Sequence, residues 1–161
     1  MNNVDICLTE TIEVIEEILA SGGEFRMYPR GRSMRPCIVE GRDSVVLVKK
    51  APQEIRRYDM LFYRRDNGQF VLHRLMKIEK DGTYTMCGDG QSFLEKGIRP
   101  EQIIGCVQRM YRKERCKTLH SLGYWLYVRV WSWIFLRRCV RFAARVLHKL
   151  ARVLRLKKGE N

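Results

Sequence analysis

The chain has 161 residues, of which 45% are apolar and 10% are aromatic. This composition supports a packed core and excludes a wholly disordered, collagen-like or disulfide-only chain. The longest apolar run, residues 122–136, contains Arg129 and is short for a membrane-spanning helix. The acidic, amphipathic N-terminus does not resemble a secretory signal, so we expect a protein that is not secreted. The cysteines form no CxxC pair or metal-ligand cluster, which predicts reduced thiols, no metal and no cofactor.

The net charge of +13 is unevenly distributed along the chain. Residues 1–108 contain 16 basic and 16 acidic side chains, whereas residues 109–161 contain 15 basic and 2 acidic ones. A neutral front part and a strongly basic last third are physically different segments. We therefore predict a helix over residues 1–23, a β domain over 24–111 and a basic helical tail over 112–161.

The predicted elements begin with a helix, because Leu8, Ile12, Ile15 and Leu19 recur at the spacing of one helical face. Short strands separated by turn signals such as Asp66-Asn67-Gly68 follow this helix. The predicted strands are residues 24–28, 44–48, 60–63, 70–78, 84–87 and 103–110. Such a series is typical of a mainly β, mostly antiparallel domain.

The tail predicts an amphipathic helix, since apolar residues recur at helical spacing over residues 140–154 and basic residues centre on the opposite side. Aromatic rings beside apolar residues and arginines are typical of the water–lipid boundary. The predicted membrane contacts are Trp125, Trp131, Trp133 and the basic helix 137–158. The alternatives are a helix docked on the β domain with a solvated basic face, and nucleic-acid binding. Nucleic acid is less favoured, because the tryptophans do not interleave with the basic face.

The clearest candidate for chemistry is Ser33, in the segment Gly-Arg-Ser-Met-Arg-Pro that ends at Pro36. Gly31 permits tight backbone geometry, and Pro36 limits the chain after the serine. An exposed serine on a rigid turn can act as a nucleophile when a base activates it. Without such a base, Ser33 is an ordinary turn residue.

His73 is the only histidine in the neutral part and lies in a predicted strand. Imidazole can serve as a base near neutral pH, with an ordinary pKa of about 6.5; the alternative is a structural histidine bonded to a carbonyl. Asp89, between two glycines, and Glu95 are candidates to orient this imidazole, although Asp89 also fits a plain turn. His120 and His148 fit ordinary positions in the tail.

Together these segments resemble the signal peptidase I and LexA-type serine peptidase superfamily. Ser33-Met34-x-Pro36 resembles its nucleophile motif, and Gly88-Asp89 resembles the Gly-Asp motif that follows the base strand. The pair His73-Arg74 on that strand resembles the His-Arg pair of the family's endoplasmic-reticulum-type branch. The segment Gln102-Ile103-Ile104-Gly105 resembles the motif with which the family's series usually ends. The motifs keep the family's order over residues 24–108, roughly half of the chain.

The resemblance implies a partly open, barrel-like antiparallel β domain and a serine endopeptidase that cleaves a peptide or protein substrate. Ser33 would be the nucleophile and His73 the general base, with Asp89 or Glu95 orienting the imidazole. The Ser33 N–H would contribute to the oxyanion hole. The chain departs from the family at Gly31, which lacks a hydroxyl, and in having Glu95 where the branch often has Asp.

A second hypothesis is a catalytically inactive β domain that binds a peptide or partner, with a tail that determines where the domain is located. For either hypothesis we expect the protein to be membrane-associated, peripherally or through its C-terminal segment, and otherwise cytoplasmic. A hydrogen bond between Ser33 and His73 would favour the peptidase.

Overall fold

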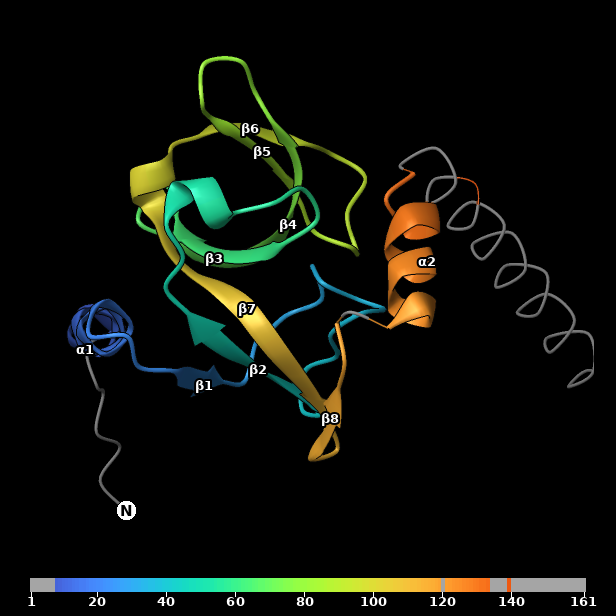
Figure 1. Cartoon of the computed structure of the whole chain (residues 1–161), viewed down its shortest axis with the longest axis horizontal. Coiled ribbons are helices and arrows are strands. Elements are labelled where there is room, and N and C mark those ends of the chain that lie inside the picture. The colour runs from blue at the N-terminus through green and yellow to red at the C-terminus, as the bar shows by residue number, and fades with distance from the viewer. Residues whose placement is uncertain (1–7, 120, 134–138, 140–161) are drawn as a thin grey trace, which may run out of the picture.

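The computed structural model of the chain describes residues 8–119, 121–133 and 139, and its strands form one antiparallel sheet (Figure 1). The strands are β1 (Phe25–Met27), β2 (Asp43–Val48), β3 (Met60–Arg64), β4 (Phe70–Ile78), β5 (Tyr84–Cys87), β6 (Glu95–Ile98), β7 (Ile103–Arg112) and β8 (Arg115–Lys117). The helices are α1 (Leu8–Ala20) and α2 (Leu122–Trp131), with single 3-10 turns at Pro52–Glu54 and Pro100–Gln102.

The order of the strands is β1-β2-β7-β3-β4-β5-β6, with β8 paired to β7, and the sheet does not close. Its pairings are antiparallel throughout. The expectation of a mainly β, antiparallel fold with an N-terminal helix is therefore confirmed. The predicted basic helix 137–158 lies outside the described residues, except for Cys139.

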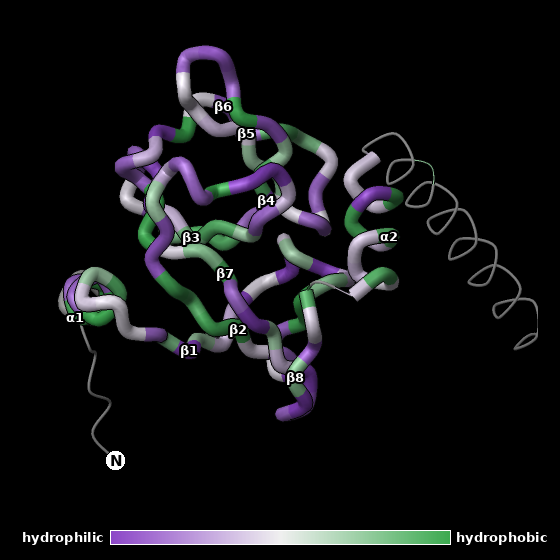
Figure 2. The backbone as a smooth tube through the Cα atoms, in the orientation of Figure 1, coloured by the Kyte–Doolittle hydropathy of each residue, from purple (hydrophilic) through white to green (hydrophobic). Residues whose placement is uncertain are grey.

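Both faces of the central strands are buried, which explains why these strands read as apolar runs rather than as alternating patterns. On β3, Met60 and Phe62 belong to one core cluster, whereas Leu61 and Tyr63 belong to a second cluster on the other face. The hydrophilic stretch between β4 and β5 lies at the periphery (Figure 2). Neighbouring residues of one strand therefore act in different environments.

Two strands, β6 and β8, were missed by the sequence prediction. In β6 only Ile98 is buried, and all three residues of β8 are exposed, so neither strand has the apolar pattern that predicts a strand. Strand β8 pairs with the last residues of β7 and lies beyond the predicted domain end at residue 111. Among the described residues no helix is long and apolar enough to cross a membrane.

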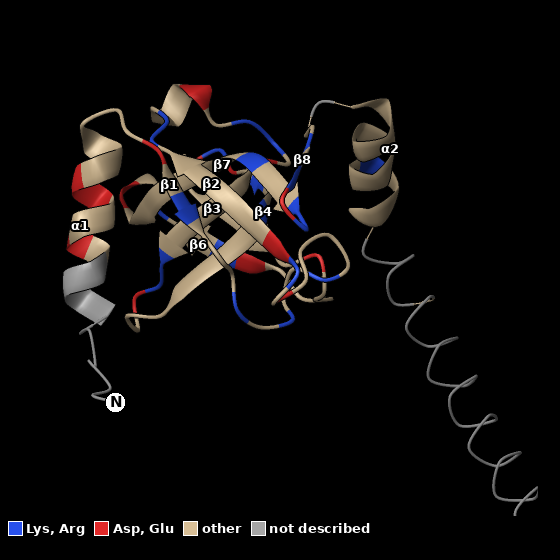
Figure 3. Cartoon of the chain, turned by 90° about the horizontal axis from the view of Figure 1, so that it is seen from below, with Lys and Arg blue, Asp and Glu red and all other residues tan. Residues whose placement is uncertain are grey.

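Helix α1 packs on the sheet at the end of the molecule opposite to α2 (Figure 1). It buries Ile12, Ile15 and Leu19, while Glu13, Glu16 and Glu17 are exposed (Figure 3). A Cβ placed on Gly105 of β7 would lie 3.0 Å from the Leu19 Cδ1, so a glycine at this position lets the helix approach closely.

Leu19→Ala should lower the free energy of unfolding by about 2–5 kcal/mol, because it leaves a cavity at a fully buried position. Urea denaturation measures this loss. The matched control is Val14→Ala on the exposed side of α1, which should change stability by less than about 0.5 kcal/mol. Equal stabilities for the two variants would contradict the packing of α1 on β7.

Candidate active site

Ser33 lies in an irregular segment between β1 and β2 that buried side chains anchor to the core. Met34, Cys37 and Ile38 are buried, whereas Ser33 itself is half-buried. Gly31 has a φ of 91°, in the left-handed region that favours glycine. The apolar neighbours therefore fix the turn while the Ser33 side chain remains near the surface.

The loop after β5 holds the main chain of Ser33. Gly90 N–H donates a hydrogen bond of 2.6 Å to the Ser33 carbonyl oxygen. A Cβ on Gly88 would lie 2.4 Å from the same oxygen, and a Cβ on Gly90 would lie 2.4 Å from the Arg32 carbonyl oxygen. Only glycines allow this approach, so the two glycines around Asp89 are needed to seat the serine turn.

The register of β4 and β5 relates this contact to His73. The pairing of the two strands includes Arg74 opposite Cys87, and His73 and Gly88 are the next residues outward on each strand. The Ser33 carbonyl oxygen therefore packs against Gly88, which follows β5 at the end of the β4–β5 pair where His73 precedes Arg74. Residues more than 30 positions apart in the sequence thus meet at one end of the β4–β5 pair.

His73 is almost fully buried and belongs to a hydrogen-bonded chain with Tyr63 and Glu95. Its Nδ1 lies 3.0 Å from the Tyr63 hydroxyl oxygen, which donates to Glu95 Oε2 over 2.8 Å. The direct separation of His73 Nδ1 and Glu95 Oε2 is 3.6 Å. Arg65 fixes the carboxylate with two hydrogen bonds of 2.6 Å each.

The charges in this chain determine which nitrogen of His73 carries the proton. Burial raises the pKa of Glu95, but the hydrogen bonds from Arg65 and Tyr63 outweigh it and the pKa is lowered. An ionised carboxylate only accepts, so the single Tyr63 proton goes to Glu95 and the Tyr63 oxygen accepts from His73 Nδ1–H. Burial lowers the pKa of His73 to about 4, against the opposing charge of Glu95. The imidazole is therefore neutral at pH 7, with its lone pair on Nε2.

His73 Nε2 is buried and has no hydrogen-bond partner among the described residues. The hydrogen bond from Ser33 Oγ to this nitrogen is consequently not formed in the structure. A neutral imidazole with a free Nε2 lone pair is nevertheless the state that a general base requires. The lowered pKa differs from the ordinary value of about 6.5 expected from the sequence, because a strand position buried on both sides disfavours the charged ring.

Asp89, the other candidate for orienting His73, is bonded to Arg74 instead. Arg74 Nε and Nη2 donate to its two carboxylate oxygens over 2.8 and 2.7 Å, and both side chains are 1% exposed. The two carboxylates that the sequence left as alternatives therefore lie in different places. Glu95 is linked to His73 through Tyr63, and Asp89 is half of a buried ion pair.

Helix α2 completes the surroundings of this ion pair. Tyr124 accepts a hydrogen bond of 3.0 Å from Arg74, and Tyr127 donates one of 3.0 Å to Asp89. Trp131 Nε1 donates to the Asp89 carbonyl oxygen over 2.9 Å. Trp131, which the sequence grouped with the membrane-facing tryptophans, is thus bonded to the loop that holds the serine turn.

Tyr63 and Arg65 were not identified from the sequence. They lie at the end of an apolar strand, where an aromatic and an arginine are ordinary residues. The one signal in the sequence is that residues 61, 63 and 65 share a strand face. Their partner Glu95 lies about 30 residues away, so no local pattern links them.

Among the described residues, no group of three or more histidine, cysteine, aspartate and glutamate side chains could hold a metal ion. His120 and His148 lie outside the described residues. No protein-family model matches the chain, and neither the curated proteins nor the solved structures contain a match.

Asp89→Ala should destabilise the fold by about 3–5 kcal/mol, because it leaves the Arg74 charge buried without its partner. Chemical denaturation measures the loss. The control Glu101→Ala removes an exposed carboxylate and should cost less than about 0.5 kcal/mol. An Asp89→Ala variant as stable as the control would contradict a structural role for the pair.

Tyr63→Phe should abolish the preference of His73 for a proton on Nδ1, because it removes the Tyr63 hydroxyl, which lies 3.0 Å from that nitrogen, and leaves Glu95 Oε2 at 3.6 Å. Long-range ¹⁵N–¹H correlation spectra of histidine-labelled protein report the tautomer. The control Tyr84→Phe removes another buried hydroxyl and should leave the His73 signals unchanged. A wild-type protein with the proton on Nε2 would contradict the assigned hydrogen-bond chain.

Proposed function

We propose that the protein is a serine endopeptidase of the signal peptidase and LexA-type class, with a partly open, barrel-like domain and a Ser33/His73 dyad. The observation that carries the proposal is the state of His73. It is neutral, its proton is directed to Nδ1 by Tyr63, and its Nε2 has no partner among the described residues. The Ser33 main chain packs at the same end of β4 and β5.

The mechanism uses each of these groups in turn. Ser33 Oγ attacks the carbonyl carbon of the scissile peptide bond while His73 Nε2 takes the hydroxyl proton. The imidazolium formed is stabilised by Glu95 through the Tyr63 hydroxyl, and the Ser33 N–H stabilises the oxyanion. His73 then gives the proton to the leaving amine, and water hydrolyses the acyl-enzyme with the same base.

The missing Ser33–His73 hydrogen bond favours the second hypothesis, a catalytically inactive domain that binds peptides. Catalytic hydrogen bonds are often long or misaligned in free enzymes and tighten when the substrate binds. The peptidase proposal therefore requires this bond to form in the substrate complex. The two functions differ in whether a bound peptide is cleaved.

We also propose that the peptidase is membrane-associated and otherwise cytoplasmic, and that it cleaves a peptide or protein substrate at a membrane surface. The support is the strong excess of basic residues in residues 109–161 together with Trp125 and Trp133, which are exposed. Basic residues next to exposed aromatic rings bind anionic membrane surfaces. Nucleic acid is the less favoured alternative partner of the basic segment.

Ser33→Ala and His73→Ala should each lower the cleavage of soluble and membrane-embedded signal-type peptides by at least about 100-fold, as measured by mass spectrometry. The double variant should be no worse than either, because nucleophile and base act as a unit. The matched controls Ser21→Ala and His148→Ala should retain activity. His73→Ala with more than about a tenth of wild-type activity would contradict the dyad.

The pH profile follows from the lowered pKa of His73. Only the neutral ring accepts the serine proton, so the rate of cleavage should rise as the pH increases through about 4. The rate should show no further step near pH 6.5, the ordinary pKa of histidine.

A wild-type protein that binds these peptides but cleaves none of them would instead be the inactive binding domain.

A further inference from the structure

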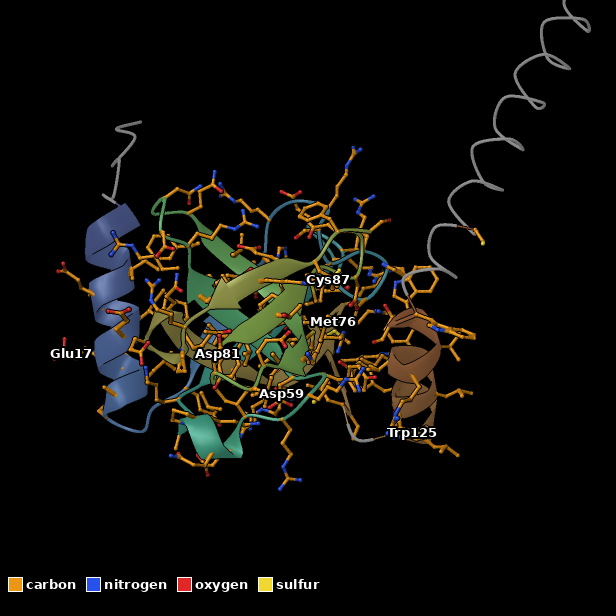
Figure 4. The ribbon with its side chains drawn as sticks, turned by 90° about the horizontal axis from the view of Figure 1, so that it is seen from above. Glu17, Asp59, Met76, Asp81, Cys87 and Trp125 are labelled. Carbon is orange, nitrogen blue, oxygen red and sulfur yellow. The ribbon has the colours of Figure 1, made fainter. Side chains whose placement is uncertain are left out.

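Helix α2 has two apolar faces, and only one of them contacts the sheet. The inner face carries Tyr124, Tyr127, Val128 and Trp131, which pack towards the Arg74–Asp89 pair and the core. At about 100° per residue, the outer residues fall within about 140° of arc on the opposite side. These exposed residues of α2 are Leu122 (80%), Trp125 (52%), Leu126 (55%) and Val130 (46%), and Trp133 (71%) is exposed two residues beyond the end of the helix. Figure 4 labels Trp125 on α2, at the end of the molecule away from α1.

Arg129 is the only charged residue of α2, and it stands within the outer arc (Figure 3). Its guanidinium lies 5.1 Å from the ring centre of Trp125 and 5.7 Å from that of Tyr58. A second guanidinium, that of Arg57, lies 4.7 Å from the ring centre of Tyr58. Arginines and aromatic rings thus alternate from the outer face of α2 to the segment before β3, at distances typical of cation–π contacts.

A cavity of about 570 Å³ lies beside this arrangement, between α2, β7 and the segment before β3. Four cationic side chains line it, namely Lys50, Arg56, Arg57 and Arg129. The one carboxylate in its lining, Asp59, is bonded to Lys50 over 3.1 Å. The cavity is therefore positive and opens next to an apolar helix face.

Tyr58 is held in an unusual conformation at the wall of this cavity. Its φ is 79°, in the left-handed region that costs energy for a residue other than glycine. Its N–H donates to the Leu75 carbonyl over 2.7 Å, and its carbonyl accepts from Arg74 over 3.0 Å. These hydrogen bonds fix the backbone and present the ring between Arg57 and Arg129.

We propose that the outer face of α2 and the adjoining cationic cavity form one lipid-contact surface, which binds a bilayer containing anionic phospholipids. The apolar side chains enter the interfacial region, and Lys50, Arg56, Arg57 and Arg129 receive the lipid phosphates. Tryptophans among exposed apolar residues beside arginines fit the water–lipid boundary.

The charge of the sequence beyond α2 also favours an anionic bilayer as the partner, since residues 134–161 contain nine basic side chains and one acidic side chain. The inference deepens the proposed membrane location and does not depend on peptidase activity. It adds Lys50, Arg56 and Arg57 of the β domain to the membrane contacts that the sequence predicted within residues 112–161.

Tryptophan quenching in vesicles with brominated acyl chains tests the outer face directly. With the full-length protein bound to phosphatidylglycerol-containing vesicles, Trp125 and Trp133 should be strongly quenched. Trp125→Phe/Trp133→Phe should still bind, but its remaining Trp131, on the inner face, should be quenched far less. Vesicle flotation without quenching of the wild-type protein would mean that the tail alone attaches it, and would overturn the proposal.

Charge substitutions test the cavity. Arg56→Gln/Arg57→Gln should weaken binding to anionic vesicles by about 25-fold, at about fivefold for each cation removed. The matched control Lys80→Gln/Lys113→Gln removes the same charge at exposed positions in the β4–β5 and β7–β8 turns, outside this surface, and should weaken binding by less than about twofold. Equal losses in the two variants would overturn the assignment of the cavity.

A substitution of the apolar face separates this inference from the proposed enzyme. Trp125→Ser/Leu126→Ser should lose vesicle binding while cleavage of a soluble peptide is unchanged, because both side chains are exposed and lie outside the dyad. Wild-type self-association that this variant abolishes, with no quenching by brominated lipid, would identify the face as a dimer interface and overturn the proposal. Failure of peptide cleavage in the wild-type protein would leave the vesicle results unaffected.

Discussion

The buried ion pair between Arg74 and Asp89 is the interaction on which the rest of the candidate site depends. It joins β4 to the loop after β5, and that loop bonds the main chain of Ser33 through Gly90. The pair is stable in the interior because its remaining hydrogen-bonding capacity is satisfied by Tyr124, Tyr127 and backbone groups. Three segments that are far apart in the sequence are thereby fixed to each other.

Because side chains alternate along β4, the residue with a structural role and the candidate base lie on opposite faces of the sheet. Arg74 faces the cluster that contains Met34 and Cys37, and His73 faces the cluster that contains Tyr63. One residue of the His-Arg pair can therefore hold the scaffold while its neighbour carries a lone pair for proton transfer. The two carboxylates follow the same division, with Asp89 on the arginine and Glu95 linked to the histidine through Tyr63.

Helix α2 connects the candidate site to the proposed lipid-contact surface. Its inner aromatic residues bond the Arg74–Asp89 pair, and its outer residues are exposed beside the cationic cavity. A bilayer bound at the outer face would lie one helix diameter from the loop that seats Ser33, about 10 Å. Such a geometry suits a peptidase whose substrate is presented at a membrane surface.

The sequence by itself determined the helix α1, six of the eight strands in the described part of the chain to within a few residues, and the residues Ser33, His73, Asp89 and Glu95 as candidates. Local periodicity and turn signals carry that information, because each depends on residues close in the chain. The edge strands β6 and β8 were missed because backbone pairing, and not an apolar pattern, holds them in the sheet.

Only the tertiary structure decided which carboxylate serves the histidine, and it supplied Tyr63 and Arg65. Those contacts join residues about 30 positions apart across three strands, so the spacing of residues along the chain does not predict them. The pKa of His73 and the inward position of Trp131 were likewise decided by tertiary packing. Burial and partners set a side chain's charge and orientation, and both are properties of the folded neighbourhood and not of the local sequence.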